Sequence, residues 1–261
     1  MFLVLNKEKI CAYLVSIVTV VLLFLVASNM KSNNNIAVQT SSSLKENLPI
    51  YSVKTDENKV ALTMNCAWNA DDIDSILETL NKKNVKITFF IVGDWIEKFP
   101  DAVKKIYEAG HEIGTHSDTH PHVNNLSYEK NVEQLARSNE KIEKITGKKA
   151  DLYRAPYGEY NDTVIKSAKD NGYYTIQWSL DTLDYTGLTG EEMWNRLNGK
   201  IKKGDIILMH NGTEHTADSL EYLINKIKEK NLEIVKVSDL IYKDNYYIDN
   251  TGMQIKSNND E

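Results

Sequence analysis

Short apolar runs and longer amphipathic stretches alternate along most of the chain. The short runs are rich in β-branched and aromatic residues, which is typical of strands buried in a sheet. Strands are therefore predicted at 59–64, 85–92, 111–114, 152–153, 173–178, 205–209 and 232–235.

Between these runs, apolar side chains recur every three or four residues, which is the spacing of one face of a helix. Residues suited to helix ends fit the same pattern, because Ser127 and Asn161 can cap helix starts while Gly147 and Gly172 can end helices. Helices are predicted at 73–80, 100–110, 127–147, 161–172, 189–198 and 216–230.

The alternation predicts an α/β fold with a mostly parallel sheet. About seven strand–helix units in about 190 residues favour a closed barrel with fewer units than the usual eight. In such folds the reactive side chains lie at the carboxyl ends of the strands. Catalytic or metal-binding side chains are therefore expected just after the predicted strands.

The N-terminal 30 residues differ from the rest in hydropathy. Lys7 and Lys9 precede an uncharged, largely apolar run at 10–28, which is 19 residues long. A helix needs roughly 20 such residues to span a bilayer, and lysines ahead of the span favour a cytoplasmic N-terminus and an external domain. We expect residues 1–30 to form an uncleaved signal anchor with one transmembrane helix; cleaved secretion is the alternative.

Composition divides the remaining chain and excludes two classes of protein. Residues 31–50 are rich in Ser, Asn and Lys and predict a flexible tether, 51–248 hold the folded domain, and 249–261 predict a polar, frayed tail. A net charge of −6 argues against a nucleic-acid-binding protein. The only cysteines, Cys11 and Cys66, are too far apart to indicate a disulfide framework. We expect the domain to be monomeric.

The segment His116-Ser-Asp-Thr-His120 is the strongest local indication of chemistry. Two imidazoles four residues apart, on one face of a helical turn, can hold one divalent metal ion. Four of the six histidines lie between His111 and His122, which weakens the alternative that the pair is merely exposed at the surface. His122 itself is predicted to be solvated.

Two further strand ends carry candidate catalytic groups. Arg154 begins the segment Arg-Ala-Pro-Tyr-Gly158, which predicts a tight loop able to present a backbone N–H to a developing oxyanion. His210 ends a strongly apolar strand and could act as a general acid, with Asp184 as the carboxylate that holds its ring. In isolation, Arg154 would be a solvated residue of a surface turn and His210 a structural histidine.

These motifs, in this order, carry a family resemblance. Over roughly residues 60–240 the chain resembles the NodB-homology polysaccharide deacetylases, the family-4 carbohydrate esterases, and it is most similar to their sporulation-associated, signal-anchored group. The resemblance implies a distorted (β/α) barrel and a divalent metal, zinc or a similar ion such as cobalt, held by two histidines and an aspartate. The metal would polarise an acetamide carbonyl and activate water, with a second aspartate as base.

Carried over by motif, the family's roles fall on particular residues of this chain. The resemblance implies that His116 and His120 are metal ligands, that Arg154 orients the base, and that His210, tuned by Asp184, protonates the leaving amine. The oxyanion and acetyl-binding positions would be Tyr157, Gly158, Tyr185 and Leu208.

The first motif departs from the family pattern Thr-Phe-Asp-Asp-Gly. Here the segment reads Thr63-Met-Asn65-Cys66-Ala, so Asn65 takes the position of the base and Cys66 that of the metal-binding carboxylate. An amide cannot accept a proton near neutral pH, and losing a positioned base costs roughly 10²–10⁴ in rate. Cys66 could complete a Cys-His-His zinc site or be a small buried apolar residue. The carboxylates considered as replacements are Asp71, Asp72 and Asp118.

Two functions remain open at this point. One is a metal-dependent deacetylase that removes acetyl groups from N-acetylated sugars of peptidoglycan or a related cell-wall polysaccharide. The other is a catalytically impaired or inactive glycan-binding or scaffold protein on the same fold. The retained histidines and Arg154 favour the enzyme, whereas Asn65 favours the binding protein.

Overall fold

The computed structural model describes residues 48–257. The predicted signal anchor at 1–30 and all but the last residues of the predicted tether lie outside this range. No helix within residues 48–257 is long and apolar enough to cross a membrane.

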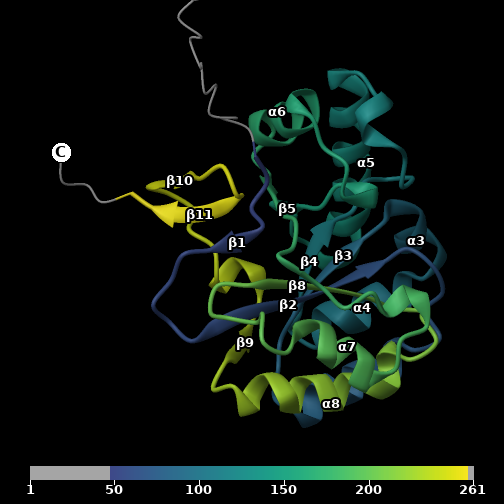
Figure 1. Cartoon of the computed structure of the whole chain (residues 1–261). Coiled ribbons are helices and arrows are strands. Elements are labelled where there is room, and N and C mark those ends of the chain that lie inside the picture. The colour runs from purple at the N-terminus through teal and green to yellow at the C-terminus, as the bar shows by residue number, and fades with distance from the viewer. Residues whose placement is uncertain (1–47, 258–261) are drawn as a thin grey trace, which may run out of the picture. The chain divides into compact units, whose positions relative to one another are not determined.

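Seven parallel strands form the centre of the domain, in the order β6-β5-β4-β3-β2-β8-β7. Figure 1 labels the central strands of this sheet, from β5 to β8. An additional strand, β9, pairs with the first half of β2. The strands are β2 Lys59–Cys66, β3 Thr88–Ile91, β4 Glu112–Thr115, β5 Leu152–Tyr153, β6 Tyr174–Thr175, β7 Leu180–Asp181, β8 Ile206–His210 and β9 Glu233–Val235.

Helices fill the connections between these strands, as the alternating pattern predicts, except between β6 and β7, where the structure has none. The helices are α2 Ile73–Lys82, α3 Gly93–Lys98, α4 Pro100–Glu108, α5 Tyr128–Thr146, α6 Asp162–Asp170, α7 Gly190–Leu197 and α8 Thr216–Glu229, with short 3₁₀ turns η1 Val123–Asn125, η2 Pro156–Gly158, η3 Asp184–Thr186 and η4 Val237–Asp239. Strands β6 and β7 lie at the two edges of the sheet and do not pair with each other, so the barrel is incomplete. The seven parallel strands fit the predicted distorted (β/α) barrel with about seven units, whereas the expected closure is not present within residues 48–257, because β6 and β7 do not pair.

The predicted helix caps are present. The Ser127 hydroxyl accepts a hydrogen bond from Lys130 N at 3.3 Å, and the Asn161 side chain accepts one from Val164 N at 3.0 Å. Gly147 ends α5 with φ 72°, a left-handed conformation that glycine adopts without strain. These local signals explain why the bounds of α5 and α6 could be predicted closely.

A second, small sheet holds the end of the described chain. Its order is β1-β11-β10, with β1 Ser52–Val53, β10 Tyr246–Ile248 and β11 Met253–Lys256. The prediction of a frayed tail at 249–261 is therefore wrong for 253–256. The reason is Gln254, which is fully buried, accepts a hydrogen bond from Tyr242 N at 2.9 Å and donates one to Tyr242 O at 2.6 Å.

The side chains of strand β2 face two different environments, the helix-covered core and the interior of the barrel. The strand is buried along its length, and its side chains alternate between these two environments. Leu62, Met64 and Cys66 pack in the main core with the inner faces of the helices. Thr63 and Asn65 therefore point to the opposite side of the strand, toward the barrel interior.

Candidate active site

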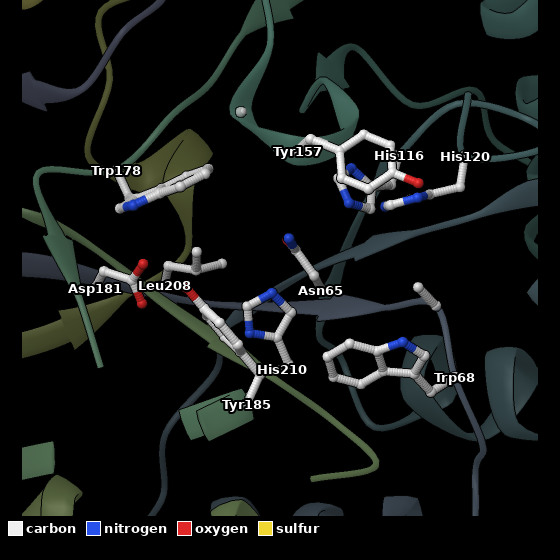
Figure 2. A pocket seen from close by; sticks show the side chains of 12 residues that line it. Asn65, Trp68, His116, His120, Tyr157, Trp178, Asp181, Tyr185, Leu208 and His210 are labelled. Atoms are coloured by element: carbon white, nitrogen blue, oxygen red, sulfur yellow. The ribbon is translucent and has the colours of Figure 1, made fainter. Parts of the chain in front are cut away.

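A cleft of about 490 Å³ opens at the carboxyl ends of the central strands (Figure 2). The residues around it come from segments far apart in sequence, from the end of β2 to the end of β8. The lining residues are Asn65, Ala67, Trp68, His116, His120, Tyr157, Gly158, Trp178, Asp181, Tyr185, Leu208 and His210. The cleft thus brings together the histidines, the Tyr157 loop and the β8 histidine, as the motif order predicts.

His210 is held by a buried carboxylate beneath the cleft. Asp184 is fully buried, and its Oδ1 lies 2.9 Å from His210 Nδ1. The same carboxylate accepts hydrogen bonds from His210 N at 2.5 Å, Thr216 Oγ1 at 2.8 Å and Tyr185 N at 3.0 Å. Because Nδ1 faces a carboxylate, the other ring nitrogen of His210 is left for the cleft. The pairing of Asp184 with His210 predicted from sequence is confirmed.

Two aromatic rings flank the imidazole of His210. The ring of Trp68 lies 5.4 Å from it, centroid to centroid, and that of Tyr185 lies 5.3 Å away and nearly perpendicular. Both aromatic side chains are half exposed, at 49% each. Together they give this side of the cleft an apolar, solvent-facing wall.

His116 and His120 lie on the other side of the cleft, with their ring centroids 4.9 Å apart. His116 Nδ1 lies 2.7 Å from the Arg154 carbonyl oxygen, so Nδ1 carries the proton and Nε2 is left with its lone pair. The two residues are not on a helical turn, because Ser117 and His120 have φ 66° and 56°. They are instead brought together by the loop after β4, in which Ser117 and His120 have left-handed backbone conformations.

Arg154 lies fully buried below the cleft, not in a solvated turn. Its Nη1 donates to Thr63 Oγ1 at 2.8 Å and to Asn65 Oδ1 at 3.0 Å. The guanidinium also lies 4.1 Å from the centre of the Phe90 ring. Burial lowers the pKa of Arg154 to about 9, and the charge of Asp181 acts in the opposite direction. The position expected to hold a general base therefore holds an amide that accepts from a buried cation.

The loop after β5 places Tyr157 at the rim of the cleft. Tyr157 has φ 59°, which is a strained conformation for a residue with a side chain. Its ring lies 4.5 Å from that of His120 and is stacked on that of exposed His122 at 4.3 Å. Strain of this kind is concentrated at functional sites, although the role of the Tyr157 N–H as an oxyanion donor stays a prediction.

Two lining residues were given no role from sequence. Trp68 follows the abnormal first motif, and its position two residues after the end of a buried strand was the available signal. Asp181 is the only carboxylate among the residues that line the cleft, and burial raises its pKa. Sequence alone did not show that the side chains of Trp68 and Asp181 face the cleft.

Comparison with known proteins identifies the family. Residues 52–176 match the sequence profile of the polysaccharide deacetylases. A peptidoglycan-N-acetylglucosamine deacetylase of Bacillus cereus is 30% identical over 73% of this chain and 70% of its own length. The chain belongs to the polysaccharide deacetylase family.

Two further similar proteins carry names that do not describe an active deacetylase. The Bacillus subtilis protein YlxY, named as uncharacterized, is 37% identical over 74% of this chain, and the chain spans 60% of its length. The solved structure of BA3943 from Bacillus anthracis, described as a CE4 family pseudoenzyme, matches with 36% identity and a TM-score of 0.71 over 74% of this chain and 69% of its own. A BA3943 mutant is described as having restored enzymatic activity.

The metal implied for this family is only partly matched by the residues present. His116 fits a metal ligand, because its second ring nitrogen is held by a carbonyl. Within residues 48–257, however, no three His, Cys, Asp or Glu side chains are grouped to hold a metal ion. Of the two alternatives for Cys66, the structure favours the small buried apolar residue, because its side chain belongs to the core cluster together with Met64 and does not line the cleft.

The carboxylates proposed as substitutes for the base do not reach the cleft. Asp118 is buried against α3 and binds Lys141 Nζ at 2.5 Å. Asp72 accepts hydrogen bonds from Gly212 N at 2.7 Å and from Asn211 Nδ2 at 3.1 Å. Asp71 is exposed and does not line the cleft. The deacetylase fold and its cleft are thus retained, whereas residues 48–257 place neither an aspartate at the base position nor a third metal ligand beside the two histidines.

Proposed function

We propose that this protein binds N-acetylated cell-wall glycan in the cleft and that its hydrolytic step is impaired or absent. The observation that carries the proposal is the contact of Asn65 Oδ1 with Arg154 Nη1 at 3.0 Å. An amide in that place cannot remove a proton from water. Because Cys66 packs in the core, the neighbouring position supplies no replacement.

The shape and lining of the cleft support retained glycan binding. Trp68, Tyr157 and Tyr185 are 49%, 58% and 49% exposed although they are large aromatic residues. Exposed aromatic residues around a concave site offer flat apolar faces for a ligand with both apolar and polar surfaces, as a sugar ring has. The named peptidoglycan deacetylases among the relatives support an N-acetylated wall polymer as the ligand.

A wall ligand requires the domain to lie outside the cytoplasm. The predicted signal anchor at 1–30 supports that location, with the domain tethered to the membrane as a single-pass protein. Protease digestion of intact cells tests it. Removal of the domain without cell lysis is expected, and protection until lysis would contradict an external location.

Acetate release tests the catalytic part of the proposal. The full-length protein is incubated with N-acetylglucosamine oligomers, with and without added zinc or cobalt, and acetate is measured. We expect release at least about 100-fold below that of an active family member, because loss of a positioned base costs roughly 10²–10⁴ in rate. Release at a comparable rate would contradict impairment.

A second candidate function, an active deacetylase, is favoured by one observation. The Asp184–His210 pair is intact, with a 2.9 Å contact that holds the imidazole toward the cleft. Asn65→Asp and the double variant Asn65→Asp/Cys66→Asp restore the family's first motif stepwise. If the wild type is the active form, neither variant gains activity; if the site is impaired by this motif, metal-dependent acetate release appears in one of them.

A further inference from the structure

The guanidinium of Arg154 is fixed from all sides by neutral acceptors. Besides Thr63 Oγ1 and Asn65 Oδ1, it donates from Nη2 to Gln177 O at 3.1 Å and from Nε to Ile176 O at 3.4 Å. No carboxylate is among its hydrogen-bond partners in the described part of the chain. The group is fully buried, so its donors keep one orientation.

This fixed donor decides which way the Asn65 amide faces. Arg154 has only donors, so the atom of Asn65 that faces it must be the carbonyl oxygen. The amide nitrogen, Nδ2, then points away from Arg154. Figure 2 shows it directed into the open centre of the cleft, between His210 and the side that holds His116 and Tyr157. A hydrogen-bond donor therefore stands where a carboxylate would only accept.

We propose that Asn65 Nδ2 donates a hydrogen bond to the carbonyl oxygen of a sugar acetamide, so that the cleft selects glycan that still carries its acetyl groups. This inference rests on the proposed glycan binding and adds its specificity. An acetamide oxygen is the complementary acceptor. A deacetylated sugar presents an ammonium, which has only donors and would face the donor of Asn65 and, behind it, the positive charge of Arg154, whose hydrogen-bond partners within residues 48–257 are all neutral.

The one carboxylate that lines the cleft does not remove this preference. Asp181 lies apart from the Asn65 amide in Figure 2, on the side of Trp178. An ammonium placed beside the Asn65 amide would therefore not form an ion pair with the Asp181 carboxylate. Asn65→Asp exchanges the donor for an acceptor of nearly the same shape and keeps an oxygen for Arg154, so it changes the chemistry of the contact with little change in packing.

The test is a binding comparison with two probes, the tetramer of N-acetylglucosamine and the fully deacetylated glucosamine tetramer. Calorimetric titrations use the full-length protein in EDTA, which prevents metal-dependent hydrolysis. We expect the wild type to prefer the acetylated tetramer by about tenfold or more and Asn65→Asp to lose or reverse this preference. Asn65→Ala, which removes the donor without adding charge, should lose it without reversal.

Asn231→Asp is the matched control, because it adds the same charge at an exposed residue after α8. It should keep the wild-type preference. Binding of both tetramers with equal affinity, or an unchanged preference in both Asn65 variants, overturns this inference and leaves glycan binding intact. Failure to bind either tetramer overturns the proposed function itself, and the inference with it.

Discussion

Arg154 Nη1 donates a hydrogen bond of 3.0 Å to Asn65 Oδ1, so a fully buried guanidinium faces a neutral amide. A buried charge is costly unless an opposite charge compensates for it. Arg154 compensates through four hydrogen bonds to neutral oxygens and the face of the Phe90 ring. With Asn65 in the position of the base, the contact with Arg154 therefore lacks an opposite charge, which lowers the stability of the folded state.

The first prediction is that Asn65→Asp stabilises the folded protein. The new carboxylate would accept from Arg154 and compensate its charge. The present contact already is a hydrogen bond to a charged group, so the gain is the added ion-pair attraction less the desolvation of the carboxylate. The free energy of unfolding at pH 7 should therefore rise by on the order of 1 kcal/mol. Urea denaturation measures this change. Asn231→Asp, which adds the same charge at an exposed residue, should change the free energy of unfolding less, and a destabilised Asn65→Asp would contradict the account of Arg154.

The second prediction concerns the carboxylate beneath His210. Asp184 accepts four hydrogen bonds while fully buried. In Asp184→Asn one acceptor becomes a donor and faces other donors, which should lower the free energy of unfolding by about 2–4 kcal/mol. Exposed Asp218, in the first turn of α8, provides the control Asp218→Asn. Equal stability of the two variants in thermal unfolding would show that the Asp184 contacts contribute little.

Much of the fold could be predicted because its signals are local. The apolar spacing of α5, the Ser127 cap and the Gly147 end lie within one segment and act within it. The small sheet could not be predicted, because β11 consists of polar and apolar residues whose burial depends on pairing with β1, near the other end of the described chain, and on Tyr242, outside the strand. Helix α3 was missed because six residues carry too little periodicity.

The sequence predicted which residues form the site, but not which way their side chains point. Motif order brought His116, His120 and His210 to one cleft, as found. Sequence alone did not show that Cys66 points away from Asn65, although the alternation of β2 makes adjacent side chains face opposite sides. Nor did it show that Arg154, in a Pro- and Gly-rich segment typical of surface turns, is buried.

The third prediction is a pH dependence of stability that arises from His111. Ile87 N donates to His111 Nδ1 at 3.2 Å, and burial lowers the pKa of His111 to about 4, with the charge of Lys86 adding to the effect. The unfolded chain has a histidine pKa of about 6.5. Between these values the unfolded state binds the proton and the folded state does not, so stability is complete above about pH 6.5 and falls toward pH 4.

This contribution amounts to roughly 3 kcal/mol at most. His111→Asn keeps an acceptor for Ile87 N but does not titrate, so its stability should fall less than that of the wild type between pH 7 and pH 4. Urea midpoints across this range measure the difference. Parallel curves for the two proteins would mean that His111 does not titrate in this window.

The fourth prediction is that Cys66 is chemically silent. Burial, and to a smaller extent the charge of Asp72, raise the pKa of the Cys66 thiol well above its usual range. Since the thiolate is the reactive form, a disulfide reagent should label wild type and Cys66→Ala equally under native conditions. In urea the wild type should show one more reactive thiol than Cys66→Ala. Faster native labelling of the wild type would mean that Cys66 is accessible from the cleft.

The fifth prediction tests the aromatic wall of the cleft. The Trp68 ring lies 5.4 Å from that of His210 and is 49% exposed, so it offers a free face beside the polar groups of the site. Trp68→Ala should weaken binding of the N-acetylglucosamine tetramer about tenfold, which corresponds to about 1.4 kcal/mol. Tyr247→Ala is the matched control, because Tyr247 is a similarly exposed aromatic residue on the small sheet, outside the cleft. Calorimetry should show wild-type affinity for this control, whereas equal losses in both variants would point to nonspecific contact with the sugar and not to a cleft-bound ligand.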